Sequence, residues 1–343
     1  MKHLLISAAE PSGDQLGADL VQALAKRGPI EAYGLAGPKM RAAGVEPIAR
    51  MEDVCAMGFV EVFGRLPAIL KAQRALKKSL HRQPDAVVLI DAPDLHLPIG
   101  AAARKQGLKT IGWVSPQIWA WRPDRASTIG QSFEHLMCLF DFEPPLYPNL
   151  DARWTGHPVI DRLVRRTQVD PRLIGLTPGS RKQETDRMWP VFLAVARQIR
   201  EEHPNHRFRM ISPVPHLDVP SWIERGDTIE DLASASAVLT KSGTVTLELA
   251  VMGVPQVVAH RVHPMTHWLG QRFVHGIRHI AMPNILAGTE VIPEFVQDLN
   301  PALLASTLMG LPDHQAIDLS ALGEAGGVVG RTADHVGQWL GLA

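Results

Sequence analysis

Short, continuous apolar runs alternate with longer helical patterns along this chain, and this alternation restricts its fold more than any other feature. The clearest run, Ala-Val-Val-Leu-Ile at 86–90, is typical of a strand that is buried on both faces of a sheet. A helical pattern near 100–106 and a second apolar run at 110–114 follow it. Because strand–helix–strand is the unit of a parallel sheet, the sequence predicts the α/β class.

The same pattern begins again in the second half of the chain. Further strands are predicted at 172–176, 207–211, 237–240 and 256–259, with helices at 188–202 and 244–251. A length of 343 residues suits about two domains of ~150 residues each. We therefore predict two α/β domains, 1–157 and 158–325, which are joined near Gly156-His157-Pro158. A last helical segment within 326–343 is left free to pack on either domain.

Composition and missing motifs exclude several classes of protein. Lys and Arg (35) balance Asp and Glu (35), which disfavours a general nucleic-acid binder. Cys55 and Cys138 form no CxxC pair, and no apolar run reaches the ~18 residues of a membrane span. The motifs G-x-x-x-x-G-K-[ST], G-x-G-x-x-G, G-x-S-x-G, H-E-x-x-H and D-x-D are absent. We expect a soluble protein of a reducing compartment that uses no cofactor and no metal ion.

Three turns share one plan, in which a strand is followed by small residues and then by a helix. They lie at 10–14 (Glu-Pro-Ser-Gly-Asp), 178–181 (Pro-Gly-Ser-Arg) and 241–244 (Lys-Ser-Gly-Thr). Small residues let the backbone approach a ligand, and the free N–H groups at the start of a helix favour an anion. Arg181 adds a charge for a phosphate, and Glu248 lies about one helical turn past Thr244, within reach of sugar hydroxyls. The alternative is three ordinary turns with capping Ser and Asp.

A carboxylate follows the apolar run at 86–90, in the segment Ile90-Asp91-Ala92-Pro93-Asp94. Ligands of open α/β sheets bind at the carboxyl ends of the strands, so a carboxylate there is well placed to act as a general base. The alternative is a loop aspartate that caps the next helix. Asp91 is nearer to the end of the strand and Asp94 is the better candidate for the cap, but spacing alone does not decide between them.

Two further kinds of segment suggest a cleft wall or a surface for an anionic substrate or membrane. The segment 113–122 holds three tryptophans, which suit either an aromatic cleft wall or plain packing. Residues 65–82 carry six Lys or Arg and no acid on an amphipathic helical pattern, and 249–289 contain no Asp or Glu. Such basic faces are typical of anionic membrane surfaces, although a core-facing helix with a solvated basic side explains the first equally well.

Several motifs, taken together and in order, resemble the lipid-A-disaccharide synthase family, whose members are nucleotide-sugar glycosyltransferases (glycosyltransferase family 19). The resemblance implies the GT-B type of α/β fold, with two Rossmann-like domains facing a cleft. The matching runs are AEPSGD at 9–14, AGPKM at 36–40, MGFVEVFGR at 57–65, IDAPD at 90–94, VSPQIWAWR at 114–122, GHP at 156–158, PGSR at 178–181, SGT at 242–244 with Glu248, and MPNILAG at 282–288. They extend over about residues 3 to 300.

The resemblance implies a reaction in which UDP-2,3-diacylglucosamine donates its sugar to 2,3-diacylglucosamine 1-phosphate, with inversion, giving a β-1,6-linked disaccharide 1-phosphate and UDP. It assigns the catalytic base to Asp91. It places the UDP-sugar on Gly179, Ser180, Arg181, Ser242, Gly243, Thr244, Glu248 and Asn284. It places the acceptor in a cleft with Glu10, Ser12, Gly13, Asp14, Asp94, Ser115, Trp119 and Arg122. Acyl chains or the membrane would contact Met57, Phe59, Val60, Leu66, Ile69 and Leu70.

The resemblance also implies a cytoplasmic protein at the periphery of the inner membrane, and it allows a homodimer. The sequence departs from the family pattern at Lys182-Gln183, at Asp141, and in the segment 211–229, which is short and rich in proline. That segment lies where the nucleotide base should dock. Two alternatives therefore stay open: a related enzyme with another UDP-sugar or glycolipid acceptor, and a non-catalytic protein that binds a nucleotide sugar.

Overall fold

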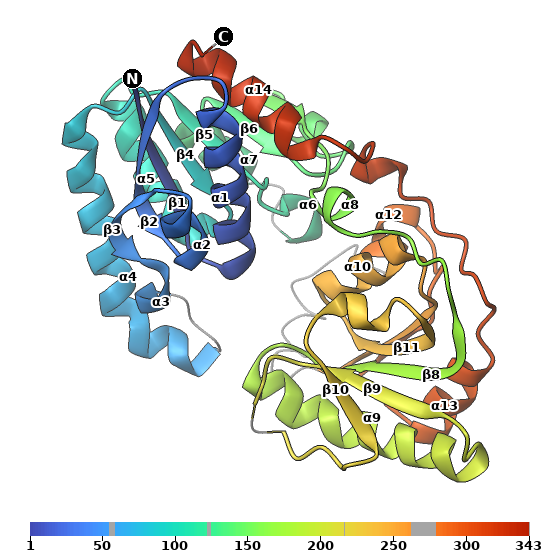
Figure 1. Ribbon diagram of the computed structural model, residues 1–343. Coiled ribbons are helices and arrows are strands. Elements are labelled where there is room, and N and C mark those ends of the chain that lie inside the picture. The colour runs from blue at the N-terminus through green and yellow to red at the C-terminus, as the bar shows by residue number, and fades with distance from the viewer. Residues whose placement is uncertain (55–58, 122–124, 216, 262–278, 343) are drawn as a thin grey trace. The chain divides into compact units, whose positions relative to one another are not determined.

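The computed structural model describes residues 1–54, 59–121, 125–215, 217–261 and 279–342, without the side chains of 59–66, 120 and 121. The chain forms two compact units (Figure 1). Unit 1 consists of Met1–Pro158 and Ala321–Ala343, and unit 2 of Val159–Ser320. Each unit is built on its own parallel sheet, so the predicted α/β class with two Rossmann-like sheets is confirmed.

The sheet of unit 1 has seven strands, in the order β3-β2-β1-β4-β5-β6-β7, and every described pair of neighbours is parallel. The strands are β1 (Lys2–Ala8), β2 (Ile30–Ala36), β3 (Glu46–Arg50), β4 (Ala86–Ile90), β5 (Thr110–Trp113), β6 (His135–Cys138) and β7 (Asp151–Trp154). The order reverses between β1 and β4. In open sheets of this kind, ligands bind at such a switch point, beyond the carboxyl ends of the strands.

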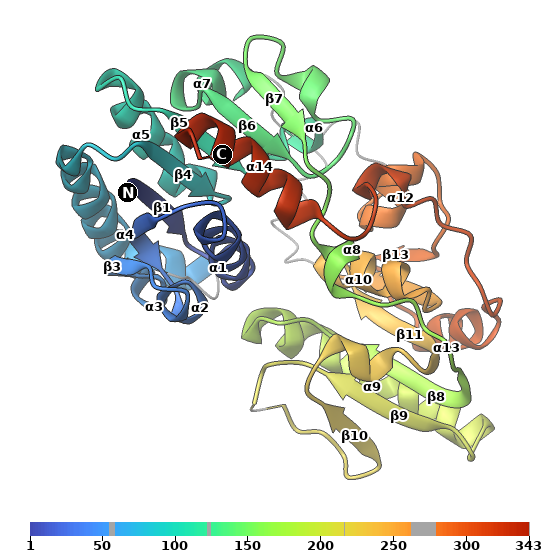
Figure 2. The same ribbon diagram turned by 45° about the horizontal axis from the view of Figure 1, so that its top comes forward.

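Helices cover both faces of this sheet. They are α1 (Pro11–Ala25), α2 (Pro38–Ala42), α3 (Met51–Val54), α4 (Phe59–Ser79), α5 (Pro93–Lys105), α6 (Ile118–Trp121), α7 (Ala126–Ser132) and α14 (Val328–Leu340). Side chains alternate along a strand, so Leu4 and Ile6 face the core under α1 and α14, whereas Leu5 faces the core under α4 and α5. The chain thus returns to unit 1 with α14, which lies along α1 (Figure 2).

The sheet of unit 2 has six strands, in the order β10-β9-β8-β11-β12-β13. They are β8 (Asp170–Thr177), β9 (Arg207–Ile211), β10 (Ile223–Gly226), β11 (Ala235–Lys241), β12 (Gln256–His260) and β13 (Glu294–Val296). The helices of this unit are α8 (Val159–Arg162), α9 (Lys182–Glu202), α10 (Thr244–Met252), α12 (Met282–Ala287) and α13 (Pro301–Met309). Phe192 of α9 is fully buried against the inner strands in the core of the unit.

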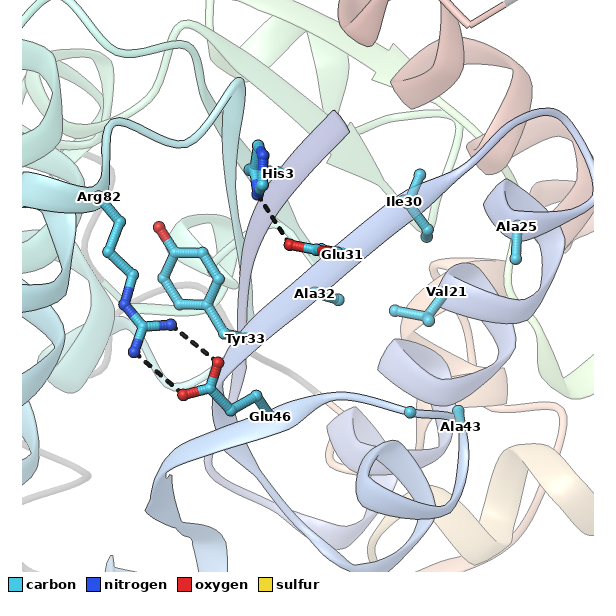
Figure 3. A pocket seen from close by; sticks show the side chains of 11 residues that line it. His3, Val21, Ala25, Ile30, Glu31, Ala32, Tyr33, Ala43, Glu46 and Arg82 are labelled. Carbon is cyan, nitrogen blue, oxygen red and sulfur yellow. Dashed lines mark hydrogen bonds and ion pairs between the residues drawn. The ribbon is translucent and has the colours of Figure 1, made fainter. Parts of the chain in front are cut away.

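One cavity of about 550 Å³ opens in unit 1, beside the first residues of β1 and β2 (Figure 3). The Arg82 guanidinium forms a bidentate pair with Glu46 (2.9 and 3.0 Å) and covers the Tyr33 ring at 4.7 Å. His3 and Glu31 face each other at 3.3 Å. The cavity lies toward the amino ends of these strands, so it is remote from the predicted site at their carboxyl ends.

Candidate active site

Asp91 follows β4 directly, at the switch point of the first sheet. Asp91 and Ala92 both have left-handed backbones (φ 53° and 46°), and so does Val114 after the neighbouring strand β5 (φ 70°). A non-glycine residue held in this region costs about 1–3 kcal/mol, and such strain clusters at functional sites. The Asp91 N–H donates to the Trp113 carbonyl (2.9 Å), which ties the two strained strand ends together.

The carboxyl group of Asp91 lies mostly inside the protein, and this distinguishes it from Asp94. Burial raises the pKa of Asp91, opposed in part by a hydrogen bond from the Ala92 backbone. The Asp94 side chain is 91% exposed and faces Arg125 at 3.6 Å. The N-cap of α5 is Ala92, without a side-chain hydrogen bond, so the alternative that Asp94 caps this helix is wrong. A half-buried carboxyl at a strand end suits a general base.

The turn at 10–14 lies beside Asp91, because β1 and β4 are neighbours and Ala8 pairs with Ile90. Helix α1 begins at Pro11 within this turn, with Glu10 and Ser12 exposed. A Cβ on Gly13 would lie 3.2 Å from the Ala8 Cβ, so glycine lets α1 pack closely on the sheet.

Asp14 is 2% exposed and its carboxylate accepts hydrogen bonds from the backbone of Lys39 (2.9 Å) and Met40 (3.0 Å). It therefore holds the start of α2.

The aromatic segment contributes Ser115 and Trp119 near the end of β5. Ser115 is buried, and the Trp119 Nε1 donates to the carboxylate of Glu143 at 3.3 Å. Glu143 is 1% exposed and also accepts from the backbone of Leu139 and Phe140, both at 3.0 Å. Burial raises the pKa of Glu143. Trp119 is thus fixed by a buried acid that the sequence did not single out, and Arg122 lies outside the described residues.

In unit 2, the turn at 178–181 connects β8 to α9. Gly179 has a φ of 125°, a conformation that glycine adopts readily. Arg181 occupies the N-cap of α9, and its side chain is 52% exposed, 4.0 Å from Glu184. Lys241, at the end of the neighbouring strand β11, forms an ion pair with the same Glu184 at 3.1 Å. Two cations, the Glu184 carboxylate and the N-terminus of α9 therefore meet at the ends of β8 and β11, next to Ser180.

The turn at 241–244 lies beside it and connects β11 to α10. Gly243 is the N-cap of α10, and none of the described residues, apart from its own neighbours in the chain, has an atom within 4 Å of the place where its Cβ would be. Ser242 donates to the carbonyl of Ile280 (2.7 Å), and Thr244 is the first residue of the helix.

Glu248 and Thr244 lie in the same helix, as predicted. The Glu248 side chain is only 14% exposed and forms an ion pair with Arg162 of α8. Burial raises the pKa of Glu248, and Arg162 opposes this rise. Sequence reasoning missed Arg162, because nothing in the spacing connects α8 to α10.

Asn284 is fully buried, and its side-chain amide is bonded on every side. Its Oδ1 accepts from the backbone of Val291 and Ile292, both at 2.8 Å, and its Nδ2 donates to the Ile292 carbonyl (2.7 Å) and to Glu294 (2.8 Å). These bonds hold the chain between α12 and β13. All four hydrogen-bonding positions of the Asn284 amide are thus used within the chain. A direct contact of Asn284 with UDP stays a prediction.

The predicted acyl or membrane surface falls on α4. Met57 and the side chains of Phe59, Val60 and Leu66 lie outside what the structure describes. Ile69 is half-buried and packs on the core of unit 1, whereas Leu70 is 40% exposed. Lys71, Arg74 and Lys78 are exposed on this helix as well. Among the described helices, none is both long and apolar enough to cross a bilayer.

Within the described ranges, no group of three or more His, Cys, Asp and Glu side chains is arranged to hold a metal ion.

Comparison with known proteins decides the family. A model of the family described as lipid-A-disaccharide synthetase matches residues 4–308. The chain belongs to the lipid-A-disaccharide synthase family. A lipid-A-disaccharide synthase of Geobacter sulfurreducens is 36% identical over 325 residues, covering 86% of this chain and 84% of the relative. That of Idiomarina loihiensis is 35% identical over 368 residues, covering 95% and 97%.

Solved structures show the same fold at low sequence identity. A Methanocaldococcus jannaschii UDP-GlcNAc 2-epimerase in complex with UDP-GlcNAc and UDP has a TM-score of 0.63 at 12% identity, with 100% of both chains covered. MurG of Acinetobacter baumannii has a TM-score of 0.58 at 16% identity, covering 98% of this chain and all of that one. A calicheamicin glycosyltransferase has 0.60 at 17%, covering 99% and 98%. The predicted GT-B type of fold is confirmed.

Proposed function

We propose that this chain transfers 2,3-diacylglucosamine from UDP-2,3-diacylglucosamine to the 6-hydroxyl of 2,3-diacylglucosamine 1-phosphate. The products are the β-1,6-linked disaccharide 1-phosphate and UDP. The observation that carries the proposal is the family match over residues 4–308, within which Asp91 stands at the switch point of the first sheet. Unit 1 would bind the acceptor and unit 2 the nucleotide sugar.

Asp91 is the proposed general base. Its carboxylate accepts the proton of the acceptor 6-hydroxyl while that oxygen attacks the anomeric carbon of the donor and the bond to UDP breaks. One base suffices, because a single displacement inverts the anomeric configuration. Burial raises the pKa of Asp91, which strengthens it as a base.

Arg181 is the proposed partner of the departing diphosphate. Negative charge grows on the leaving oxygen as the glycosidic bond breaks, and an exposed guanidinium at a helix N-terminus stabilises it. The N-terminus of α10, open at Gly243, adds a second group of backbone donors. Glu248 would accept hydrogen bonds from the sugar hydroxyls of the nucleotide.

The substrates carry acyl chains, so we further propose peripheral binding to the cytoplasmic face of the inner membrane. The exposed Leu70 with Lys71, Arg74 and Lys78 supports this proposal, because basic side chains beside an apolar one favour an anionic lipid surface. A homodimer is part of the same proposal.

The proposal is tested by incubating purified protein with the acylated UDP-sugar and the acylated acceptor. We expect both UDP and the disaccharide 1-phosphate. Parallel reactions with unacylated UDP-N-acetylglucosamine test the alternative donor that the short segment 211–229 suggests. UDP binding without any product, from either donor, would instead identify a non-catalytic nucleotide-sugar binder.

A further inference from the structure

A buried histidine holds the backbone on which Asp91 stands. His96, in the first turns of α5, is 0% exposed. Its Nδ1 lies 2.6 Å from the Asp91 carbonyl oxygen, and its Nε2 lies 2.8 Å from the hydroxyl of Ser7 in β1. Ser7, which is distant in the sequence, is thus joined through His96 to Asp91 by one chain of hydrogen bonds beneath the strand end.

The chemistry of these groups fixes the position of each proton. A carbonyl oxygen can only accept, so Nδ1 carries the hydrogen and donates it to Asp91. The imidazole is neutral, because burial lowers the pKa of His96 to about 4. Nε2 is then an acceptor, and the Ser7 hydroxyl donates to it. Ser7 is itself fully buried and pairs with Leu89 of β4, so the far end of the chain is rigid.

The other contacts of the turn show why such a tether matters. Asp91 and Ala92 are consecutive non-glycine residues in the left-handed region, which an unsupported chain leaves readily. The Ala92 carbonyl accepts the N–H groups of Leu95 and His96, both at 3.0 Å. The Asp91 N–H is bonded to Trp113, which leaves the Asp91 carbonyl as the group that His96 fixes.

We propose that His96 and Ser7 are positioning residues, which hold the left-handed Asp91 turn so that its carboxylate points at the acceptor hydroxyl. The inference rests on the proposed role of Asp91 as the base. His96 does not itself contact substrate, since its side chain is fully buried and both ring nitrogens are bonded within the chain. Its effect on the reaction passes through the Asp91 carbonyl.

Two matched substitutions separate the two ends of the imidazole. In His96→Asn the amide nitrogen stands one atom beyond Cγ, as Nδ1 does, so the bond to Asp91 is kept and the bond to Ser7 is lost. In His96→Gln the amide reaches the place of Nε2, so the bond to Ser7 is kept and the bond to Asp91 is lost. We expect kcat to stay within about 3-fold of wild type in the first and to fall about 10-fold or more in the second, because small misplacements of a reacting group cost up to about 10²-fold.

The donor KM and the UDP dissociation constant from calorimetry should be unchanged in both variants, because UDP is expected to bind to unit 2. If His96 only stabilises the fold, kcat per folded molecule should instead be equal in the two variants. Equal kcat in His96→Asn and His96→Gln, measured on protein that binds UDP normally, would therefore overturn the inference.

Ser7→Ala supplies a second test if His96→Gln does not fold. Without the hydroxyl, the imidazole can carry its proton on Nε2, so kcat should fall about 3- to 10-fold, the range of one hydrogen bond. In the His96→Asn variant, the additional change Ser7→Ala should have no further effect on kcat. An equal fall of kcat in that variant and in wild type would contradict the chain of hydrogen bonds from Ser7 through His96 to Asp91. Asp91→Asn identifies a failure of the proposed function: full turnover in that variant removes the base assignment, and the inference with it.

Discussion

The hydroxyl of Thr177 donates to that of Thr240 at 2.7 Å, and both side chains are buried. The two residues face each other at the ends of the neighbouring strands β8 and β11. The turns at 178–181 and 241–244 therefore begin side by side, at two strand ends whose separation this hydrogen bond fixes. Lys241 and Glu184 join the same turns a second time, at 3.1 Å. The two helix starts proposed to bind the diphosphate are thus held in register before any ligand arrives.

Arg181 should act on the transition state more than on the bound donor. We expect Arg181→Ala to lower kcat by about 10²-fold or more, the range of a single electrostatic donor. Arg181→Lys keeps the charge without the planar fork, so its kcat should lie between those of the alanine variant and wild type. Steady-state kinetics with the donor varied at saturating acceptor measure this. A higher KM with unchanged kcat would show uniform binding of UDP instead.

Asp91→Asn should lower kcat by about 10²–10⁴-fold, the usual contribution of a general base, with little change in UDP affinity. Asp94→Asn tests the alternative base, and it should lower kcat far less, because that side chain is 91% exposed and faces Arg125. Product formation and UDP calorimetry on both variants decide between the two carboxylates. The reverse ranking would move the base to Asp94.

Activity should survive treatment with EDTA. Arg181, Lys241 and the starts of α9 and α10 supply positive charge to the diphosphate, so no divalent ion is needed. Initial rates with and without chelator check this expectation. A large loss that magnesium restores would show that a metal ion takes part.

Binding to anionic vesicles should be peripheral and weakened by salt. Arg74→Glu reverses an exposed charge on α4 and should weaken binding by about 2 kcal/mol, or roughly 30-fold, since each basic residue contributes about 1 kcal/mol. Arg197→Glu, exposed on α9, changes the net charge equally and should bind as wild type does. Vesicle sedimentation at low and high salt measures both. Release by detergent alone would indicate hydrophobic insertion instead.

Acid should destabilise the protein through His96. Burial lowers the pKa of His96 to about 4 in the folded state, against an ordinary 6.5, so the unfolded chain binds the extra proton as the pH falls below 6.5. This contribution reduces the free energy of unfolding by about 2 kcal/mol at pH 5 relative to pH 7.5. Denaturant unfolding at the two pH values should show a smaller acid loss in His96→Asn. Equal losses would mean that His96 is charged in the fold.

The central strands could be predicted from sequence, and the outer ones could not. β4 is a continuous apolar run because both of its faces are covered. β3 and β7 lie at the edges, are short and half-exposed, and carry charged residues, so they leave no such run. The helix predicted near 100–106 in fact begins at Pro93, because a first turn with polar Asp94 and a buried His96 shows no regular apolar stripe.

The candidate site was predictable as residue types at strand ends, and less so as geometry. Spacing alone did not decide between Asp91 and Asp94. The features that separate them, burial and a left-handed turn, exist only in the folded chain. Nothing in the sequence marks His96 among fifteen histidines, or connects Glu143 to Trp119. His96 meets Ser7, and Glu143 meets Trp119, only when neighbouring strands are assembled. Contacts between side chains that folding brings together are therefore the part of the site that the sequence pattern does not predict.

The return of the chain to unit 1 bears on the order in which the protein is completed during synthesis. Ala333, Val336 and Leu340 of α14 belong to the same buried cluster as Leu20 and Leu24 of α1. Unit 2, by contrast, is one continuous stretch of chain. On the ribosome, unit 2 can therefore finish folding while unit 1 still lacks α14 and with it part of its core. The nascent amino-terminal part of unit 1 is then the region that a chaperone would need to protect.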